Sequence, residues 1–518
     1  MVMTTERLIW GILALALVVR LPLLGGSFWL DEAAQALEVI RPLSQQLDIA
    51  FDFQPPLLHL WLHLWQYFGH QEWWLRWWGA VLPGLATIWF SYHWVRTITT
   101  SKVANWTALL LATSSFHLFY SQELRPYALP AAWAAAGWWL LVKWWQSSIT
   151  GSNRYSDRRY QLGYAVVTIF GLYSSYLYAF IIPGQLLAGW LTTGRLWRRQ
   201  WAAVALAGLA FVPWLPMLKE QLAASQAVRD SLPVWETVVS IPPAKALALI
   251  FSKFVFGVVD VEPSLFFVAS SVGLLALVGW SHFWRNRHDL VSLGGRLVAR
   301  WRGGAGQSGL SRQQHGWLVL VLAVALPILL AWLFSFAVPI VRPKRLLLVL
   351  PAFFGWLSWP LGYKSAGRAA AVVPAVLLVL NVLGLSQYWA RPTLQRENWR
   401  QLHRLVSDRY PTSDSIVVFA FPDPLAPWQW YDRGAYQTVS SGRLNIGQVD
   451  NLRGRLEPIA NSNYVITFDY LTDLTDPDRR LLREIEAFNF KEVEVIDQPV
   501  IGFTRVFAQP QRLLSTNQ

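Results

Sequence analysis

The sequence predicts an α-helical protein that crosses a membrane many times and carries a water-soluble α/β domain at its C-terminal end. Of its 518 residues, 54% are hydrophobic and 14% are charged, whereas a soluble domain has about 25% charged residues. The chain also has 32 tryptophans, a residue that gathers at membrane interfaces because its ring is amphipathic. So much apolar surface indicates burial in lipid.

Apolar runs near the roughly 20 residues that a bilayer requires recur along the first three quarters of the chain. We predict about eleven spans, because one run is long enough for a hairpin of two spans that turns near Tyr173 to Tyr176. The first run is longer than the apolar core of a secretory signal, so we expect it to be a retained span. The runs are Leu8 to Leu24, Trp73 to Val95, Val103 to Tyr120, Ala128 to Trp145, Leu162 to Leu191, Trp201 to Leu218, Leu265 to Trp284, Gly316 to Phe336, Leu346 to Leu361 and Ala369 to Tyr388.

The basic residues predict the orientation. The formal net charge is +13, but lysines and arginines gather in every second short loop, which places them on the inside as the positive-inside rule predicts, so we expect no nucleic-acid partner. We expect a multi-pass protein of the plasma (inner) membrane with a cytoplasmic N-terminus. Residues 1–390 form the predicted transmembrane domain, with outer-face loops at 25–72 and 219–264, and residues 391–518 form a soluble extracytoplasmic α/β domain. The chain has no cysteine, which excludes disulfides and a thiolate nucleophile.

Several shorter segments have patterns of their own. Leu57 to Phe68 follows two prolines and is too short to cross a membrane, so we expect an interfacial helix. Ala244 to Val258 is expected to form a second surface helix. In the soluble domain, strands are predicted at Val417 to Phe421, Tyr464 to Phe468, Glu492 to Val495 and Phe503 to Phe507, and a helix at Arg479 to Phe488.

Two acids, Asp31 and Glu32, follow the first span directly. Solvated loop acids are the ordinary interpretation of such a pair. The functional interpretation is that one carboxylate is held in place as a general base. We treat the pair as a candidate catalytic site.

A second outer segment, Ser121 to Tyr127, crowds polar residues into a short connection between spans. An interfacial anchor with an ion pair between Glu123 and Arg125 would explain part of it. Such an anchor needs neither Gln122 nor this crowding, so the segment is a second candidate for the site.

Three cations, Arg342, Lys344 and Arg345, stand at the outer end of a late span. They break the charge rule that the other loops obey. Binding of lipid headgroups is one explanation. The other is a dedicated phosphate site, because guanidinium groups bind phosphate bidentately.

The segment Gln54-Pro55-Pro56-Leu57-Leu58-His59 precedes His63 by one helical turn. A histidine pair at this spacing suits a divalent cation, but an interfacial helix carries such residues anyway and no third ligand is evident. We therefore expect no resident metal and leave a divalent-cation cofactor open.

Taken together, these motifs resemble a known family. The Asp31-Glu32 pair, the Pro-Pro-Leu segment, the run Ser121 to Tyr127 and the Arg-Pro-x-Arg loop from Arg342 are similar to those of bacterial relatives of the protein O-mannosyltransferases. These are polyprenyl-phosphate-sugar-dependent glycosyltransferases of the GT-C fold, and the lipid A aminoarabinose transferases belong to the same group. The resemblance covers residue 1 to about 390, with one departure: Gln54 stands where the family often has histidine.

The resemblance implies an inverting transfer from a polyprenyl-phosphate sugar donor to a glycan, lipid or protein acceptor among membrane lipids. Asp31 would accept the acceptor's proton, and Glu32 would position Asp31 or share its role. No second carboxylate is needed as an acid, since a phosphate departs without protonation. The implied donor-phosphate residues are Arg342, Lys344, Arg345 and Arg125, and the implied positioning residues are Glu123, Tyr127, Gln122, Gln54 and His59.

Two other classes stay open. A lipid-linked glycan flippase or transporter would carry ionisable residues inside its spans and often a repeat between its halves, and neither is visible. A non-catalytic glycan-binding membrane protein would use its C-terminal domain, where the aromatic run Phe421 to Tyr431 either stacks on sugars or seals the domain onto the membrane.

Overall fold

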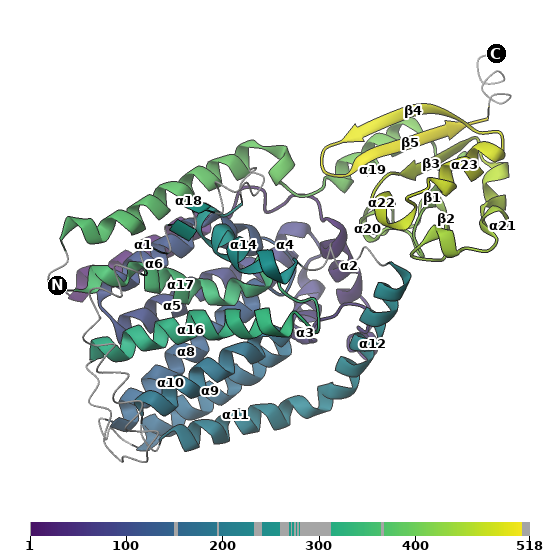
Figure 1. The fold of residues 1–518 in the computed structure, drawn as a ribbon. Helices are drawn as coiled ribbons and strands as arrows, with labels where there is room; N and C mark the ends of the chain where they lie inside the picture. Colours follow the sequence, from purple (N-terminus) through teal and green to yellow (C-terminus); the bar gives the residue numbers. More distant parts are fainter. Residues whose placement is uncertain are drawn as a thin grey trace.

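The computed structural model describes residues 2–149, 154–193, 196–232, 241–258, 312–363 and 367–509, with a few positions between 269 and 279. A bundle of long helices carries a sheet domain at one end, and the N-terminus lies at the other end of the bundle (Figure 1). The run Leu265 to Trp284, predicted as a span, lies outside the described residues apart from those few positions.

Long apolar helices build the bundle. Among the described residues, four segments are long and apolar enough to cross a membrane, namely Trp197–Ser231, Gln314–Phe334, Pro343–Gly362 and Val372–Ala390, and the shorter helices Arg7–Val18 and Tyr176–Thr192 are also apolar. The chain is therefore a membrane protein, while the number of about eleven spans stays a prediction. The helices are α1 (Val2–Val18), α5 (Leu82–Ile98), α6 (Ser101–Thr113), α8 (Ala128–Ile149), α9 (Arg154–Ser174), α10 (Ile181–Thr192), α11 (Trp197–Phe211), α12 (Leu215–Ser231), α16 (Arg312–Phe334), α17 (Leu350–Ser358) and α18 (Val372–Ala390).

The chain turns where the predicted hairpin has its turn, while the two membrane spans of the hairpin stay a prediction. Helix α9 ends at Ser174, and a 3₁₀ turn, η4 (Tyr176–Phe180), leads into α10. The hydroxyl of Ser175 accepts a hydrogen bond from the Leu177 N–H at 3.3 Å and so caps the new turn. The apolar run from Leu162 to Leu191 is thus divided into two helices at Ser174 and Ser175.

Close packing sets the positions of the central helices. Trp94 of α5 stacks on Trp138 of α8 with ring centroids 5.4 Å apart and planes 9° apart. Gly84 lets α5 approach the Ser121 segment, because a Cβ at this glycine would lie 2.5 Å from the Ser121 Cβ. The second outer segment is therefore fixed directly on α5.

Short helices at the sheet-domain end of the bundle carry the segments singled out by the sequence. Leu57 to Phe68 is helical, as predicted, and Pro243–Phe256 forms α14 close to the predicted bounds. Helix α14 packs against α18 and η7, with Ile250 and Phe254 fully buried, so one of its faces belongs to the bundle core. The elements are α2 (Leu30–Val39), α3 (Leu57–Trp65), η2 (Gln66–Phe68), α4 (Glu72–Arg76), α7 (Ser115–Tyr120), α14 (Pro243–Phe256) and η7 (Pro343–Val349).

The C-terminal domain is a five-stranded mixed sheet in the order β2-β1-β3-β5-β4. Strand β1 runs parallel to β2 and β3, while β5 runs antiparallel to β3 and β4. Two apolar clusters pack against the sheet, one around Trp399 and Trp428 and the other around Leu452 and Ile485. The elements are α19 (Trp399–Arg409), β1 (Ser415–Phe419), α20 (Ala426–Asp432), β2 (Gln437–Ser440), β3 (Tyr464–Phe468), α23 (Arg480–Ala487), β4 (Lys491–Gln498) and β5 (Gly502–Ala508).

Candidate active site

Asp31 and Glu32 occupy the first turn of α2, where the helix dipole favours negative charge. Successive helical residues point in different directions, and here one acid is fully buried while the other is half-buried. Within the part of the chain that the structure describes, Asp31 makes no hydrogen bond or ion pair. It is therefore an available carboxylate.

Glu32 has the opposite environment. Arg76 of α4 donates to both of its carboxylate oxygens, at 2.8 and 2.5 Å, and the Leu124 N–H donates to it at 2.8 Å. The guanidinium of Arg396 lies 3.6 Å away. Burial alone would raise the pKa of Glu32, but the charges of Arg76 and Arg396 outweigh it and hold the pKa below its usual value. Glu32 thus fastens α2 to α4 and to the Leu124 backbone.

The predicted phosphate residues lie near enough to Asp31 to interact with its charge. Lys344 of η7 lies between two aromatic rings, with its Nζ 5.6 Å from the Trp29 ring and 5.3 Å from the Tyr127 ring. The carboxylate of Asp31 lies within electrostatic range of this lysine. The same holds for Arg125, Arg342 and Arg345.

Several buried polar atoms around this group have no hydrogen-bond partner among the described residues. Native proteins pair nearly all such atoms, so a cluster of them indicates a place for a ligand or ordered water. The donors in the cluster suit anionic oxygen, and the acceptors suit hydroxyl groups. The atoms are Trp29 Nε1, Arg125 Nε, Arg342 Nε, Glu123 Oε1 and Gln54 Oε1.

Glu123 and Arg125 do not form the ion pair that the anchor interpretation would require. Arg125 instead donates to Asp52 at 2.9 Å, and Glu123 lies 3.6 Å from Arg396. Burial raises the pKa of Glu123, although Lys344 and Arg396 oppose the shift. Arg125 is thus paired with Asp52 and also lies within electrostatic range of Asp31.

His59 belongs to a buried network behind Arg125. Its Nε2 lies 2.6 Å from Asp52 Oδ2, and its Nδ1 lies 3.5 Å from Glu38 Oε2. Burial and the charge of Asp52 raise the pKa of Glu38 to about 7. For Asp52, burial acts in the raising direction, but Arg125 and His59 outweigh it and lower the pKa.

The same network includes the candidate cation ligands. Oxygen or nitrogen atoms of Glu38, Asp52 and His59 lie within 4.8 Å of one another, an acid and imidazole set that suits a divalent cation. His63, the expected second histidine, instead contacts the Val39 carbonyl at 2.8 Å and the Tyr67 hydroxyl at 3.1 Å. His59 and His63 therefore do not converge on one site, although their spacing would allow it.

Gln54 and Gln122 hold loops in place. The Gln54 amide donates to Gln35 Oε1 at 2.9 Å and also contacts Asp52. The Gln122 amide donates to the carbonyls of Arg20 and Pro22, at 2.6 and 2.7 Å. Both amide hydrogens of Gln122 are thus used within the protein.

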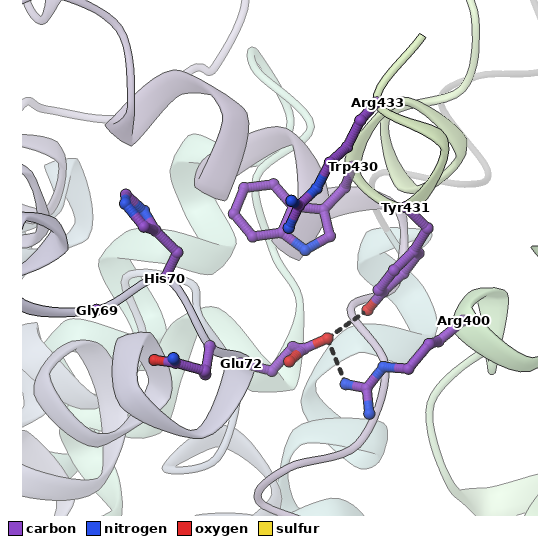
Figure 2. Close-up of a pocket in the computed structure, with 8 residues that line it drawn as sticks. Gly69, His70, Glu72, Arg400, Trp430, Tyr431 and Arg433 are labelled. Atoms are coloured by element: carbon purple, nitrogen blue, oxygen red, sulfur yellow. Dashed lines mark hydrogen bonds and ion pairs between the residues drawn. The ribbon is translucent and has the colours of Figure 1, made fainter. Parts of the chain in front are cut away.

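The sheet domain contacts the segment that leads to Asp31. The Tyr431 hydroxyl accepts a hydrogen bond from the Phe28 N–H at 2.8 Å and lies 2.9 Å from Glu72 Oε1. Arg400 pairs with the same Glu72, and its backbone N–H donates to Ser27 Oγ at 3.1 Å. Figure 2 shows Glu72 between Tyr431 and Arg400. The sheet domain therefore helps to position the first outer loop, which carries Asp31.

The sequence did not single out Arg76, Arg396, Asp52 or Glu38. The sequence gives a weak indication of Asp52, because this residue stands two positions before Gln54, where a candidate segment begins. Arg76 and Arg396 carried no local signal. Their partner Glu32 is distant in the sequence, so only the fold brings them together.

Comparison with known proteins supports the fold. No protein-family model matches the chain, and no curated protein matches its sequence. Among solved structures, the apo oligosaccharyltransferase of Archaeoglobus fulgidus matches with a TM-score of 0.51 and 10% identity over 90% of this chain and 69% of that one. The same transferase tethered to an acceptor peptide matches with a TM-score of 0.50 and 11% identity over 97% and 74%. ArnT from Cupriavidus metallidurans in the apo state matches with a TM-score of 0.45 and 14% identity over 96% of this chain and 97% of ArnT.

These structural neighbours are GT-C glycosyltransferases, the group that the sequence resembles. At such low identities the likeness concerns the fold. The chain is accordingly a mostly helical membrane protein with a C-terminal sheet domain, and its fold is similar to that of the archaeal oligosaccharyltransferase.

Proposed function

We propose that the chain is a membrane glycosyltransferase that moves a sugar from a polyprenyl-phosphate-linked donor to an extracytoplasmic acceptor by inverting displacement. One observation carries the proposal. Asp31, a half-buried carboxylate without a hydrogen-bond partner among the described residues, stands at a helix N-terminus within electrostatic range of Arg342, Lys344 and Arg345. A base opposite a phosphate-binding group is what the reaction requires.

In the proposed step, an acceptor hydroxyl oxygen attacks the anomeric carbon of the donor sugar. The bond between that carbon and the phosphate oxygen breaks, and its electron pair leaves with polyprenyl phosphate. Asp31 takes the hydroxyl proton as the new bond forms. Because attack and departure occur on opposite faces of the sugar, the configuration at the anomeric carbon inverts.

The cations of η7 would bind the donor phosphate. They begin the apolar segment Pro343–Gly362, so they lie where a lipid-linked phosphate would meet the protein. The unpartnered Nε of Arg342 offers a donor to a phosphate oxygen. Lys344 would add a point charge that stabilises the departing phosphate.

The remaining predicted residues would act by positioning. Glu32 holds α2 through Arg76, and Gln122 holds the Ser121 segment against the end of the first span. Arg125 would instead offer its unpartnered Nε to the donor phosphate, while Asp52 pairs with Arg125 and His59 contacts Asp52. Glu123 and Tyr127 flank Lys344 and would contact donor or acceptor.

The proposal includes a location. The site and the domain at 391–518 would face the outside of the inner membrane, with the N-terminus in the cytoplasm. Figure 1 places the N-terminus and the sheet domain at opposite ends of the helical bundle, which supports this orientation.

A transfer assay tests the function. Purified protein is incubated with radiolabelled polyprenyl-phosphate hexoses and pentoses and with an envelope extract from a strain that lacks the gene. Label should move to a glycan, lipid or protein fraction with release of polyprenyl phosphate, and Asp31→Asn should not support transfer. A flippase would move the donor across vesicles without releasing phosphate, and a glycan-binding protein would do neither. No transfer with any donor would reject the proposal.

A chelation arm of the same assay addresses a divalent cation. If a metal held by Glu38, Asp52 and His59 takes part, EDTA should reduce transfer, and His59→Ala should remove that sensitivity.

A further inference from the structure

A cavity of about 670 Å³ lies where the first outer loop meets the sheet domain. Residues 69–72 form one wall, and Arg400, Trp430, Tyr431 and Arg433 form the other (Figure 2). Its volume falls within the range of about 300 to 1,000 Å³ that ligand sites occupy, and ligand sites occur preferentially between domains.

The cavity has a cationic character. Its one acid, Glu72, is already paired with Arg400 and contacts the Tyr431 hydroxyl, so its negative charge is compensated. The guanidinium of Arg433 is exposed and has no hydrogen bond or ion pair with any residue that the structure describes. His70 adds further N–H capacity on the facing wall. The free donors in the cavity therefore suit an anion.

The backbone at Arg433 supports a role for this side chain. Arg433 ends α20 with φ at 52° and ψ at 28°, in the left-handed region. Glycine or asparagine usually occupies that position at a helix end, because a Cβ is disfavoured there. An arginine thus occupies a position whose backbone favours glycine or asparagine.

Aromatic side chains complete the site. Trp430 is half-buried and is held edge-on by Phe28, with ring centroids 5.5 Å apart and planes 63° apart. Its indole and the Tyr431 ring lie together on the sheet-domain wall (Figure 2). Rigid aromatic faces pack well against the C–H faces of sugar rings.

We propose that this cavity binds an anionic saccharide and holds the part of the acceptor that is remote from the reacting hydroxyl. The role as acceptor site rests on the proposed function, whereas the binding itself does not. A direct structural path links the two sites, because the Tyr431 hydroxyl binds the Phe28 N–H three residues before Asp31. An acceptor seated on Tyr431 would lie against the segment that carries the base.

The test uses the full-length protein and two defined saccharides, trigalacturonic acid and the neutral galactotriose, in titration calorimetry. Trigalacturonic acid should bind more tightly than galactotriose, and Arg433→Asn should weaken its binding roughly tenfold, the loss expected for one charge-assisted hydrogen bond. Asparagine tolerates the left-handed backbone, so this variant should fold normally. Arg483→Gln removes an exposed cation from α23 and serves as the matched control.

Three outcomes would overturn the binding site: no binding of trigalacturonic acid, equal affinity for both saccharides, or unchanged affinity in Arg433→Asn. Trp430→Leu should weaken both saccharides, since it removes the ring face and no charge. Asp31→Asn should bind like the wild type. A protein that binds trigalacturonic acid but transfers no sugar would support this binding site and reject the proposed function. A protein that transfers sugar but does not bind trigalacturonic acid would support the proposed function and reject this binding site.

Discussion

Asp31 and Glu32 are neighbouring acids that the fold separates by environment. Glu32 receives hydrogen bonds from Arg76 on both oxygens and is fully buried, so it has little capacity left for a proton. Asp31 keeps its oxygens available at the same helix end. A general base must reach the proton that it removes, and of the two only Asp31 meets this condition.

Replacing Asp31 with asparagine tests the base directly. Asp31→Asn keeps the shape but removes the proton acceptor, so turnover should fall by about 100-fold or more while donor binding survives. Single-turnover transfer and donor titration measure the two quantities separately. Asp48→Asn, at an exposed acid of the same loop, should leave both unchanged. Normal turnover in Asp31→Asn would return this acid to the role of a solvated loop residue.

The phosphate residues make a second prediction. Arg345→Ala should weaken donor binding by about 1.5 to 3 kcal/mol, because a hydrogen bond from a charged group is lost. Binding of a polyprenyl-phosphate sugar to protein in nanodiscs measures this, and Arg41→Ala at an exposed arginine of the outer loop is the control. If neither Arg342→Ala nor Arg345→Ala changes donor affinity, the cations serve lipid headgroups.

At the scale of elements, the buried ion pair between Glu32 and Arg76 holds α2 against α4. Arg76 also donates to the carbonyls of Leu24, Gly26 and Ser27, at 2.9, 2.6 and 2.9 Å. One guanidinium therefore fixes both the helix that carries Asp31 and the loop before it.

Glu32→Gln should consequently act on stability. It leaves the Arg76 charge buried without its counter-charge, which costs about 3 to 5 kcal/mol. Thermal unfolding of the purified protein should show a lower midpoint for Glu32→Gln than for Asp31→Asn. A variant with wild-type stability and a larger loss of turnover than Asp31→Asn would instead make Glu32 the base.

Elements with a strong pattern were predictable from the sequence. Strand β3 has the predicted bounds, Tyr464–Phe468, because its apolar residues form a compact run between polar ones. Strand β2, Gln437–Ser440, was missed since it is short and mostly polar and lies at the edge of the sheet. Its formation depends on pairing with β1, which no local pattern reports.

The sequence predicted which residues belong to the candidate site, but only some of the contacts between them. The charge rule and the position after the first span selected Arg342 and Asp31, and the structure brings them within electrostatic range. The pair of Arg125 with Asp52 was not predictable, because its partners come from separate loops and are joined only by tertiary packing. Local spacing instead favoured Glu123 as the partner of Arg125, a pairing that the fold does not make.

At the scale of the whole molecule, the sheet domain and the N-terminus lie at opposite ends of the bundle (Figure 1). The orientation proposed above then requires the loop before α3 and the sheet domain to face the same side. The chain has no native cysteine, so single introduced cysteines report position cleanly.

Cysteines at Ser44 and Ser413, both exposed, should react with an impermeant thiol reagent in intact cells. Lys102→Cys, at the exposed start of α6 on the side expected to face the cytoplasm, should react only after the membrane is opened. Opposite labelling of Ser44→Cys and Ser413→Cys would reject the orientation and the extracytoplasmic placement of the site.

The contacts that Arg396 and Tyr431 make with Glu32 and Phe28 join the last part of the chain to the first. A ribosome makes Asp31 early and these two partners late. The segment that carries Asp31 therefore lacks both contacts until residues 396 and 431 have been synthesised. A nascent chain that stops near residue 390 would carry every proposed phosphate residue and yet lack these contacts, so on the proposed function the enzyme would gain activity only after the sheet domain has been made and has folded against the bundle.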